Sequence, residues 1–447
     1  MSDNWLSMSA SALGRGIDAG EIDPVALTEA YLNAIAAHPE SDRIYARLTE
    51  ARARSEAEAA SRRAKDGLRR SVLDGVPISW KDLFDTADVA TEAGTALLKG
   101  RVPDTDAEVL RNATAAGLVC LGKTHMSELA FSGLGLNPVT ASPPCVNDPA
   151  AVSGGSSSGA AASVAFNLAA AGIGSDTGGS VRVPSAWNDL VGLKTSMHRL
   201  SVKGSVPLCA RFDTVGPLCR SVEDAAHLLA IMEGGKTADL SGATLAGMRL
   251  ARLQTIALDD LREAPATGFE IAVAQLEKAG AQIIDVALPS LLEAFDFGGS
   301  LFTAEAYATW GERIEANPDA MFPEILNRFR VGKDVLARDY LRGWQRLDEI
   351  REEWNTQMAG FDAVIVPSSP ILPPNHDRLL ADQEYYVTEN LLALRNTRIG
   401  NLMGLAGLTL PTGVPSAGIT FLSGPMSEEK LLRLGAAAEP LLAQKTQ

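Results

Sequence analysis

The sequence predicts an α/β fold in which helices pack on a β-sheet. Apolar, strand-like runs alternate with segments of helical periodicity from one end of the chain to the other. We find no internal repeat, low-complexity tract or long Pro/Gly linker that would mark a domain boundary. At 447 residues the length allows two or three domains, but one large α/β domain is also allowed.

The first third of the chain sets up this alternation. Helices are expected over residues 22–38, where apolar side chains follow an Asp-Pro start, and over residues 50–66, which are rich in Ala, Arg and Glu. Residues 73–79, LDGVPIS, predict a strand that runs into WKDLFD. A helix over residues 106–116 and a short buried strand over 118–121 follow.

The middle of the chain is poor in side-chain bulk and then becomes regular again. Residues 141–180 predict a loop, a helix of small residues and a second loop, with the run 160–171 as a tightly buried helix. Between about residues 245 and 290 the pattern is strand, helix (around 266–279) and strand.

The last third predicts helices followed by strands. Several helices are expected between residues 300 and 360. Further strands are expected over residues 364–370, 408–414 and 417–424, and a closing amphipathic helix over 426–442.

The net charge of the chain limits the classes of molecule that it is expected to bind. The formal net charge is −15, and a surface of that sign repels nucleic acid and anionic membranes, so we expect a small-molecule substrate. The N-terminus lacks the basic and apolar regions of a signal peptide, and no run of 18 apolar residues occurs. We therefore expect a cytoplasmic protein with reduced thiols. No metal-ligand spacing joins the four cysteines, Cys120, Cys145, Cys209 and Cys219.

Two Gly/Ser-rich loops mark the candidate site. Residues 153–159 read SGGSSSG, and residues 174–184 read GSDTGGSVRVP. Such segments are costly to order, which is explained if the backbone presents N–H groups to an anion or approaches a reacting centre. A flexible linker is the alternative. It is disfavoured because both loops adjoin the expected buried helix.

The sequence also contains two short patterns of general catalytic or binding motifs, but the segments around them do not fit those motifs. Residues 117–124, GLVCLGKT, fit a phosphate-binding loop, but a helix-like stretch precedes them and LVCL is strand-like. Residues 155–159, GSSSG, fit the nucleophile elbow of α/β-hydrolases. A Pro-containing stretch precedes that motif instead of a strand, and none of the five histidines stands in an evident catalytic context.

A third interpretation accounts for both loops and for a lysine upstream. SGGSSSG and GSDTGGSVRVPS resemble the two halves of the signature of the amidase signature family, and GVPISWKDLFD resembles its lysine segment. DPVALTEAYL, GKTHMSELAFSG, FDTVGPLCRSVEDAA and GNLMGLAGLTLPTGV resemble further blocks, so the match spans nearly the whole chain and is weakest between about 235 and 390.

The resemblance implies both a fold and a set of roles. It implies one α/β/α domain over residues 1–447 around a central mixed sheet, with the core signature at about 70–220 and variable substrate-pocket helices at about 290–400. Ser180 would be the nucleophile, Ser156 a bridging serine held through a cis peptide bond, and Lys81 the base. The oxyanion hole would consist of the backbone N–H groups of Thr177, Gly178, Gly179 and Ser180.

This triad is chemically coherent. A serine hydroxyl needs a base within hydrogen-bond reach, and lysine serves as one only if burial lowers its pKa well below about 10.4. Neutral Lys81 could accept a proton from Ser156, which accepts one from Ser180, because a hydroxyl both donates and accepts. The expected reaction is hydrolysis of an amide through an acyl-enzyme, with carbamates or esters as further substrates and no metal or organic cofactor.

Other residues near the motifs have expected supporting roles. Met126 belongs to the methionine-containing segment, and Ser157 is expected to hydrogen-bond the loop. Asp176 is expected to accept backbone N–H bonds, and Arg182 either orients the loop or binds a substrate carboxylate. Cys145 is expected to be a free, buried thiol.

Two rival functions remain open. One is the glutaminase (A-type) subunit of a tRNA-dependent amidotransferase, which needs an acid and an arginine in its pocket. Arg395 and Arg398 lie in a suitable region, but no matched acid can be assigned. The other is a non-catalytic binding or assembly protein, which would be expected to lack the lysine or one serine, although all three are present. Whether the chain forms a homodimer is left open.

Overall fold

The computed structural model describes residues 2–442, so Met1 and residues 443–447 of the expected domain lie outside it. Within the described residues, 11 strands form one sheet in the order β1-β3-β2-β4-β6-β5-β10-β11-β9-β7-β8. The strands are β1 (Tyr45–Leu48), β2 (Pro77–Lys81), β3 (Val119–Thr124), β4 (Gly172–Asp176), β5 (Val191–Lys194), β6 (Thr214–Cys219), β7 (Arg249–Leu253), β8 (Gln282–Val286), β9 (Ala363–Pro367), β10 (Ala406–Pro411) and β11 (Gly418–Ser423).

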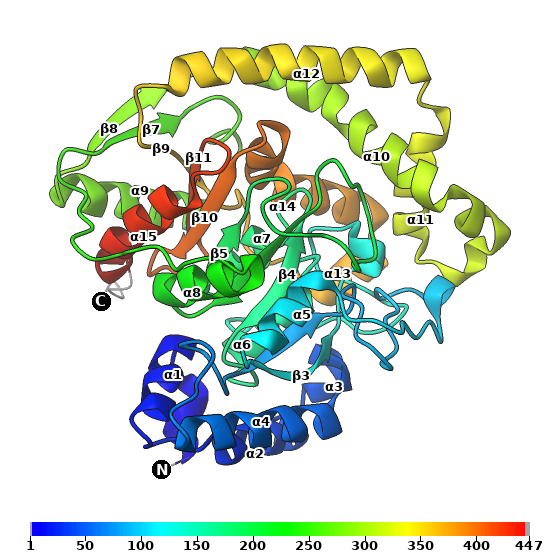
Figure 1. Cartoon of the computed structure of the whole chain (residues 1–447). Coiled ribbons are helices and arrows are strands. Elements are labelled where there is room, and N and C mark those ends of the chain that lie inside the picture. The colour runs from blue at the N-terminus through cyan, green and yellow to red at the C-terminus, as the bar shows by residue number, and fades with distance from the viewer. Residues whose placement is uncertain (1, 443–447) are drawn as a thin grey trace.

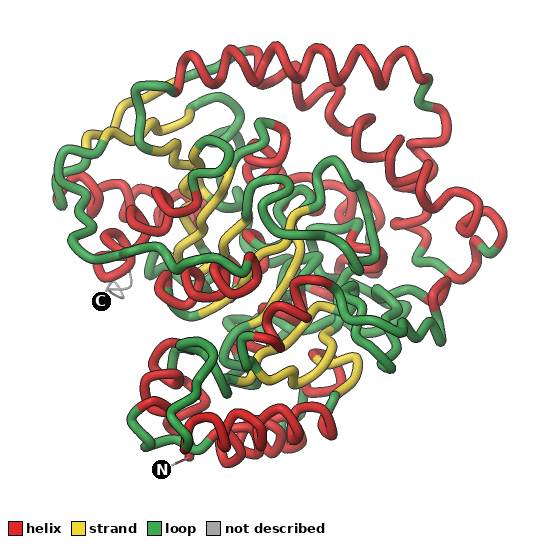
Figure 2. The backbone as a smooth tube through the Cα atoms, viewed as in Figure 1, coloured by secondary structure: helices red, strands yellow, loops and turns green. Residues whose placement is uncertain are grey.

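Helices flank this sheet, which confirms the predicted fold class (Figures 1 and 2). The α-helices are α1 (Ala10–Asp18), α2 (Pro24–Ala37), α3 (Ser41–Ile44), α4 (Glu50–Lys65), α5 (Glu108–Ala115), α6 (Ser158–Ala165), α7 (Arg182–Trp187), α8 (Val222–Glu233), α9 (Glu263–Lys278), α10 (Ser290–Ala316), α11 (Pro323–Arg330), α12 (Ala337–Met358), α13 (His376–Ala381), α14 (Gln383–Leu402) and α15 (Glu428–Leu442). Short 3-10 helices are η1 (Ser2–Ser7), η2 (Ala96–Leu98), η3 (Glu128–Ala130), η4 (Pro318–Ala320) and η5 (Val331–Asp334).

The sheet is mixed in a specific way. Strands β3, β2 and β4 run parallel to one another at one side, and β9, β7 and β8 do so at the other. The strands between them, from β6 to β11, pair antiparallel. Helices α1, α2 and α4 lie together near the N-terminus, whereas α10, α11 and α12 form a separate group at the opposite side of the view (Figure 1).

One segment differs from the sequence-based expectation. The small-residue helix ends at Ala165 instead of continuing to residue 171, and Asn167 turns the chain with a φ of +59°. Residues 172–176, expected as loop, form strand β4 between β2 and β6. An apolar run of small residues does not distinguish helix from strand by its periodicity, so the partners in the sheet decide.

The parallel pair β2 and β4 positions the candidate site. Every residue of both strands is buried. Ser79 pairs with Gly172 and Trp80 with Ile173, so the strands end at the same edge of the sheet. Lys81 and Asp176 are their last residues. The loops that follow both strands therefore start side by side.

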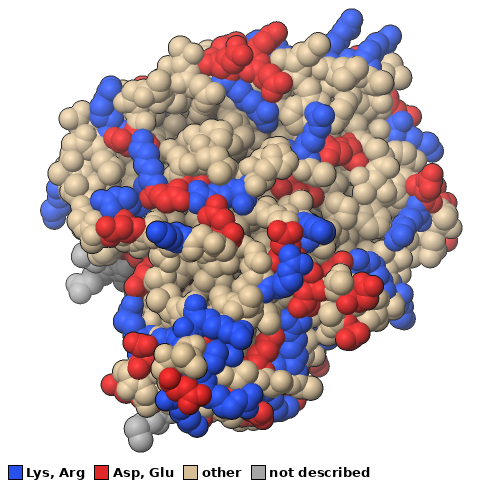
Figure 3. Space-filling view, viewed as in Figure 1, with Lys and Arg blue, Asp and Glu red and all other residues tan. Residues whose placement is uncertain are grey.

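Charged side chains lie mostly outside this core. On the face drawn in Figure 3, acidic and basic side chains are interspersed over the surface. The net charge of −15 is therefore mixed with positive groups on that face.

Candidate active site

Lys81 is a buried lysine at the end of β2. Its side chain has no exposed surface, and its Nζ lies 2.7 Å from Ser156 Oγ and 2.8 Å from Ser175 Oγ. Burial lowers the pKa of Lys81 to about 7, against the opposing charges of Asp213 and Asp176. Burial disfavours the charged ammonium, so a neutral amine is present near neutral pH.

Ser156 lies in the loop that precedes α6. The Gly155–Ser156 peptide bond is cis, the geometry that the resemblance implies for the bridging serine. The Ser156 carbonyl accepts a hydrogen bond from Ser127 N at 3.2 Å. A Cβ on Gly155 would lie 2.5 Å from Ser127 Oγ and 2.6 Å from Gly135 N, so only glycine fits at this point of the loop.

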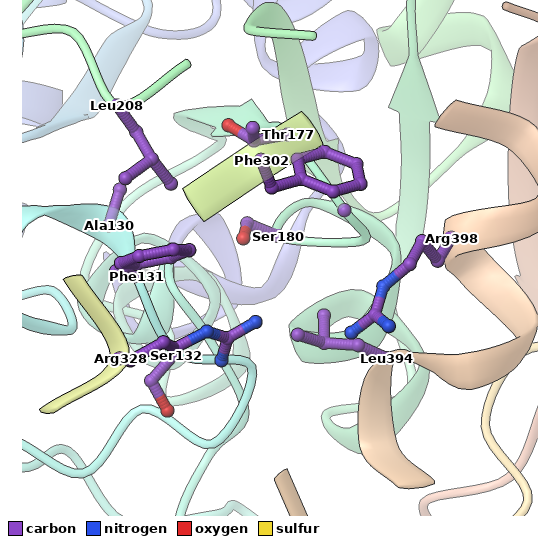
Figure 4. A pocket seen from close by; sticks show the side chains of 11 residues that line it. Ala130, Phe131, Ser132, Thr177, Ser180, Leu208, Phe302, Arg328, Leu394 and Arg398 are labelled. Carbon is purple, nitrogen blue, oxygen red and sulfur yellow. The ribbon is translucent and has the colours of Figure 1, made fainter. Parts of the chain in front are cut away.

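Ser180 lies in the loop between β4 and α7 and lines a cavity with about 340 Å³ of empty space (Figure 4). The residue is 4% exposed, and the exposed part faces this cavity. The remaining walls are Ala130, Phe131, Ser132, Thr177, Gly178, Leu208, Phe302, Arg328, Leu394 and Arg398. A side-chain hydroxyl at the wall of a small cavity can reach a carbonyl group placed inside it.

The link between the two serines is looser than the link from Ser156 to Lys81. Within residues 2–442 we find no hydrogen bond between Ser156 Oγ and Ser180 Oγ. The loops themselves are joined, because Ser157 N donates to the Ser180 carbonyl at 3.2 Å. Nucleophile and base are often loosely aligned until substrate binds, so this geometry is compatible with a relay.

The backbone N–H groups of residues 177–180 differ in whether they have a hydrogen-bond acceptor. Within the described part of the chain, the N–H groups of Thr177, Gly178 and Ser180 have no acceptor. Gly179 differs, because its N–H donates to Asp176 Oδ1 at 2.9 Å. Gly179 has a φ of +138°, and a Cβ there would lie 2.0 Å from Thr397 Oγ1. Glycine is therefore required at this position by both backbone conformation and space.

Asp176 and Arg182 form a buried pair that holds this loop. The Asp176 carboxylate accepts from the backbone N–H of Gly179 and Val181, and from Arg182 Nε at 3.0 Å and Nη2 at 2.9 Å. Arg182 also donates to the Thr397 carbonyl at 2.6 Å. The charge of Arg182 holds the pKa of Asp176 well below its usual range, against the opposing effect of burial. Arg182 therefore orients the loop, and its donors face protein acceptors instead of the cavity.

The other residues named from the sequence lie outside the cavity wall. Ser157 Oγ donates to the Ser175 carbonyl at 3.2 Å and accepts from Ser175 N at 3.3 Å, which joins the serine loop to β4. Met126 is fully buried, and its carbonyl accepts from Asn137. Cys145 is a buried free thiol, and its Sγ donates to the Trp187 carbonyl at 3.2 Å.

The two arginines near the C-terminal strands differ from each other. Arg395 donates to the carbonyl of Asp259 and, at 3.2 Å, to Asn396 Oδ1, so it is held by protein acceptors. Arg398 lines the cavity instead (Figure 4).

The rejected motifs have structural explanations. Residues 119–124 of the phosphate-loop pattern form strand β3, so its backbone pairs with β2 and cannot cradle a phosphate. Ser157, the central residue of the elbow pattern, donates a hydrogen bond from its Oγ to the Ser175 carbonyl in β4.

Several site residues were missed by the sequence analysis. Ser175 contacts Lys81 directly, yet a serine inside a strand carries no local signal of that contact. Asp213 accepts from Thr177 Oγ1 at 2.5 Å, and burial raises the pKa of Asp213 to about 6. Arg328 and Phe302 reach the cavity from α11 and α10, helices in the region where the resemblance is weakest.

The part of the chain that the structure describes contains no cluster of three or more His, Cys, Asp or Glu side chains arranged to hold a metal ion. No helix in the same range has the length and apolar character needed to span a membrane.

The comparison with known proteins identifies the family. The family model described as Amidase matches residues 26–432, which is most of the chain. The chain belongs to the amidase family. This confirms the resemblance seen in the two Gly/Ser loops and the lysine segment.

Individual members of the amidase family are similar to this chain over most of its length. A 2-amino-5-chloromuconic acid deaminase from Comamonas testosteroni is 33% identical, covering 88% of this chain and 87% of that protein. The A-type subunit of the glutamyl-tRNA(Gln) amidotransferase from Anaeromyxobacter dehalogenans is 31% identical, covering 95% and 94%. The crystal structure of the native peptide amidase from Stenotrophomonas maltophilia matches with a TM-score of 0.82 at 27% identity, covering 98% of each chain.

Proposed function

We propose that this chain is an amidohydrolase that cleaves the C–N bond of small amides through an acyl-enzyme on Ser180. One observation carries the proposal. The Nζ atom of the buried Lys81, whose pKa is about 7, lies 2.7 Å from Ser156 Oγ. The loop that bears Ser156 is hydrogen-bonded to the loop that bears Ser180. A lysine in this state is a general base at neutral pH, and Ser180 faces the cavity where a carbonyl would lie.

The proposed reaction transfers two protons along the triad. Ser180 Oγ attacks the carbonyl carbon, its proton passes to Ser156 Oγ, and the Ser156 proton passes to Lys81 Nζ. When the C–N bond breaks, the leaving nitrogen takes a proton back through Ser156. Water then attacks the acyl-enzyme by the same route and releases the acid. The same steps would open carbamates and esters.

The proposed oxyanion site is the loop from Thr177 to Ser180. The N–H groups of Thr177, Gly178 and Ser180 have no acceptor within the described residues and are the proposed donors. The N–H of Gly179, which the resemblance also implies as a donor, is bonded to Asp176 and would hold the loop in shape. A single preorganised donor of this kind contributes about 3–4 kcal/mol to transition-state stabilisation.

A glutaminase is the second candidate, because a relative named as the A-type component of an amidotransferase is 31% identical over 95% of this chain. A pocket for free glutamine must neutralise an ammonium and a carboxylate. The cavity wall contains two arginines, Arg328 and Arg398, and no acidic side chain among the described residues. That composition favours a substrate without an ammonium group, so we place the glutaminase second.

Release of ammonia or amine from a panel of substrates tests the proposal. Small aliphatic amides, aryl amides, aryl carbamates and glutamine would be compared, with Ser180→Ala as the blank. Turnover of simple amides by the wild-type protein alone, abolished in Ser180→Ala, is the expected result. Turnover of glutamine alone would favour the second candidate, and equal turnover by Ser180→Ala would refute the mechanism.

A further inference from the structure

Two arginines converge on the cavity next to Ser180. Arg328 comes from α11 and Arg398 from α14, and both line the cavity wall. In Figure 4 their guanidinium groups approach from opposite sides, with Leu394 between them and Ser180 above. These two helices are far apart in the sequence, so only the fold brings the two cations together.

Neither guanidinium has an anionic partner in the described part of the chain. No salt bridge involves Arg328 or Arg398 there, and Arg328 Nη1 is buried without a hydrogen-bond acceptor. Arg328 is held instead over the ring of Phe131, with Cζ 4.5 Å from the ring centroid. Glu128, a buried acid in the neighbouring η3, is bonded to Thr95 Oγ1 at 2.7 Å and to Phe322 N at 2.9 Å.

The electrostatic consequence is a local excess of positive charge. Burial and the neighbouring charge of Arg328 lower the pKa of Arg398 to about 9, and burial lowers the pKa of Arg328. Leaving a buried charge without a counter-ion is strongly unfavourable. The guanidinium edges point into a cavity that holds Ser180, so an anionic group of the bound substrate would supply the missing charge.

We infer that the substrate is a small amide that carries a carboxylate, and that Arg328 and Arg398 bind this carboxylate while the scissile carbonyl meets Ser180. Guanidinium groups match carboxylates in shape and donate paired hydrogen bonds to them. The apolar side chains of the cavity wall, which include Phe131, Phe302 and Leu394, suit the methylene chain of a short acid. The inference rests on the proposed hydrolase function and adds the class of substrate to it.

The kinetic test compares acids with neutral amides of the same length. Succinamate and glutaramate would be measured against their neutral methyl-ketone analogues, 4-oxopentanamide and 5-oxohexanamide, by ammonia release. We expect Arg328→Gln and Arg398→Gln each to lower kcat/KM for the acids by about 100-fold, and to lower it much less for the neutral amides. Arg330→Gln is the matched control. It removes the same charge from α11, but Arg330 pairs with Glu315 on the surface, at 2.8 Å.

A binding test separates this inference from the proposed function. Succinate and glutarate would be titrated calorimetrically into Ser180→Ala, which cannot turn over, and into the same protein with Arg398→Gln added. Binding that Arg398→Gln abolishes supports the carboxylate site, even if no amide in the panel is hydrolysed.

Three results would overturn the inference. They are absence of carboxylate binding to Ser180→Ala, equal binding of inorganic phosphate, and equal loss of acid and neutral substrates in both arginine variants. If neutral amides are hydrolysed in a Ser180-dependent way under any of these results, the hydrolase proposal stands without the carboxylate site.

Discussion

Lys81 Nζ donates a hydrogen bond of 2.7 Å to Ser156 Oγ, although 75 residues separate the two in the chain. The contact exists because β2 ends next to β4, and the loop that bears Ser156 packs against β4 through Ser157. The same amine lies 2.8 Å from Ser175 Oγ inside β4. The Lys81 amine is thus buried with two hydroxyl groups as its hydrogen-bond partners, and burial favours its neutral form.

The rate is expected to fall on the acid side of neutrality. The pKa of Lys81 is about 7, and only the neutral amine accepts a proton, so kcat/KM should fall by about tenfold per pH unit below that value. A pH profile with a small amide measures this. A rate that stays constant between about pH 5 and 9 would exclude Lys81 as the base.

Lys194 supplies the matched control for that profile. Burial also lowers its pKa to about 7, but its Nζ donates to the carbonyls of Thr195 and Leu405 and lies outside the cavity wall. Lys194→Met should therefore keep the fall in rate below pH 7 (the acid limb of the pH profile) unchanged, whereas Lys81→Met should be inactive. Loss of the acid limb in Lys194→Met would show that Lys194, and not Lys81, causes the fall in rate.

Lys81→Met should gain stability relative to the wild-type protein as pH falls from about 10.5 to 7. The pKa of Lys81 falls from 10.5 to about 7 on folding, so the unfolded chain must release a proton to fold, and this penalty grows as pH falls from 10.5 to 7. The substitution also leaves the buried hydroxyl groups of Ser156 and Ser175 without the amine, which costs about 1–3 kcal/mol for each group at every pH. The difference in the free energy of unfolding between variant and wild type, measured in urea, should therefore favour the variant more at pH 7 than at pH 10, by roughly 3–4 kcal/mol. A difference that is the same at both pH values would contradict the lowered pKa.

Asp213→Asn should move the acid limb to lower pH. The charge of Asp213 raises the pKa of Lys81, so its removal lowers that pKa. Asp213 also accepts from Thr177 Oγ1 at 2.5 Å and from the backbone of Leu208 at 2.9 Å, so kcat should fall as well. A shift of up to about one pH unit is expected. An upward shift would contradict this assignment, whereas a purely structural role would lower kcat without moving the limb.

Gly179→Ala should disable the site while Gly178→Ala is tolerated better. A Cβ at Gly179 would lie 2.0 Å from Thr397 Oγ1, and the alanine would have to adopt the φ of +138° that Gly179 has. A Cβ at Gly178 would meet no atom within 4 Å. Displacing the loop by about 1 Å should lower kcat/KM by about 100-fold in Gly179→Ala.

Comparison of Gly178→Ala with Gly179→Ala also tests the explanation for the loss of activity. Thermal unfolding would show that both variants fold. Equal losses in the two variants would mean that the space around Gly179 does not control the loop. Adding Thr397→Ala to Gly179→Ala should restore only part of the rate, because the left-handed backbone conformation remains.

The sequence names the residues of the candidate site, but most of their contacts are visible only in the structure. Lys81, Ser156 and Ser180 were named from the motifs that carry them, and Lys81 and Ser156 are in contact. The interpretation of Asp176 as a backbone acceptor agrees with its bonds to Gly179 and Val181. Both loops are defined by short-range patterns of Gly and Ser, which a single sequence displays directly.

The missed elements share a physical cause. Strand β4 was hidden in a run of Gly, Ser and small apolar residues, which have no marked periodicity, and it exists because β2 and β6 supply its hydrogen bonds. Ser175 and Asp213 acquire a role through neighbours distant in sequence.

The α/β class, the family and the candidate triad can be inferred from the amino-acid sequence, because these depend on alternation and on motifs that are local in the chain. The tertiary structure alone decided how far the pKa of Lys81 falls, because that depends on burial by the whole sheet. It also decided that Arg182 turns inward to Asp176, while Arg328 and Arg398 face the cavity without a counter-ion among the described residues. Charge compensation is a property of three-dimensional neighbours, and no spacing along the chain records it.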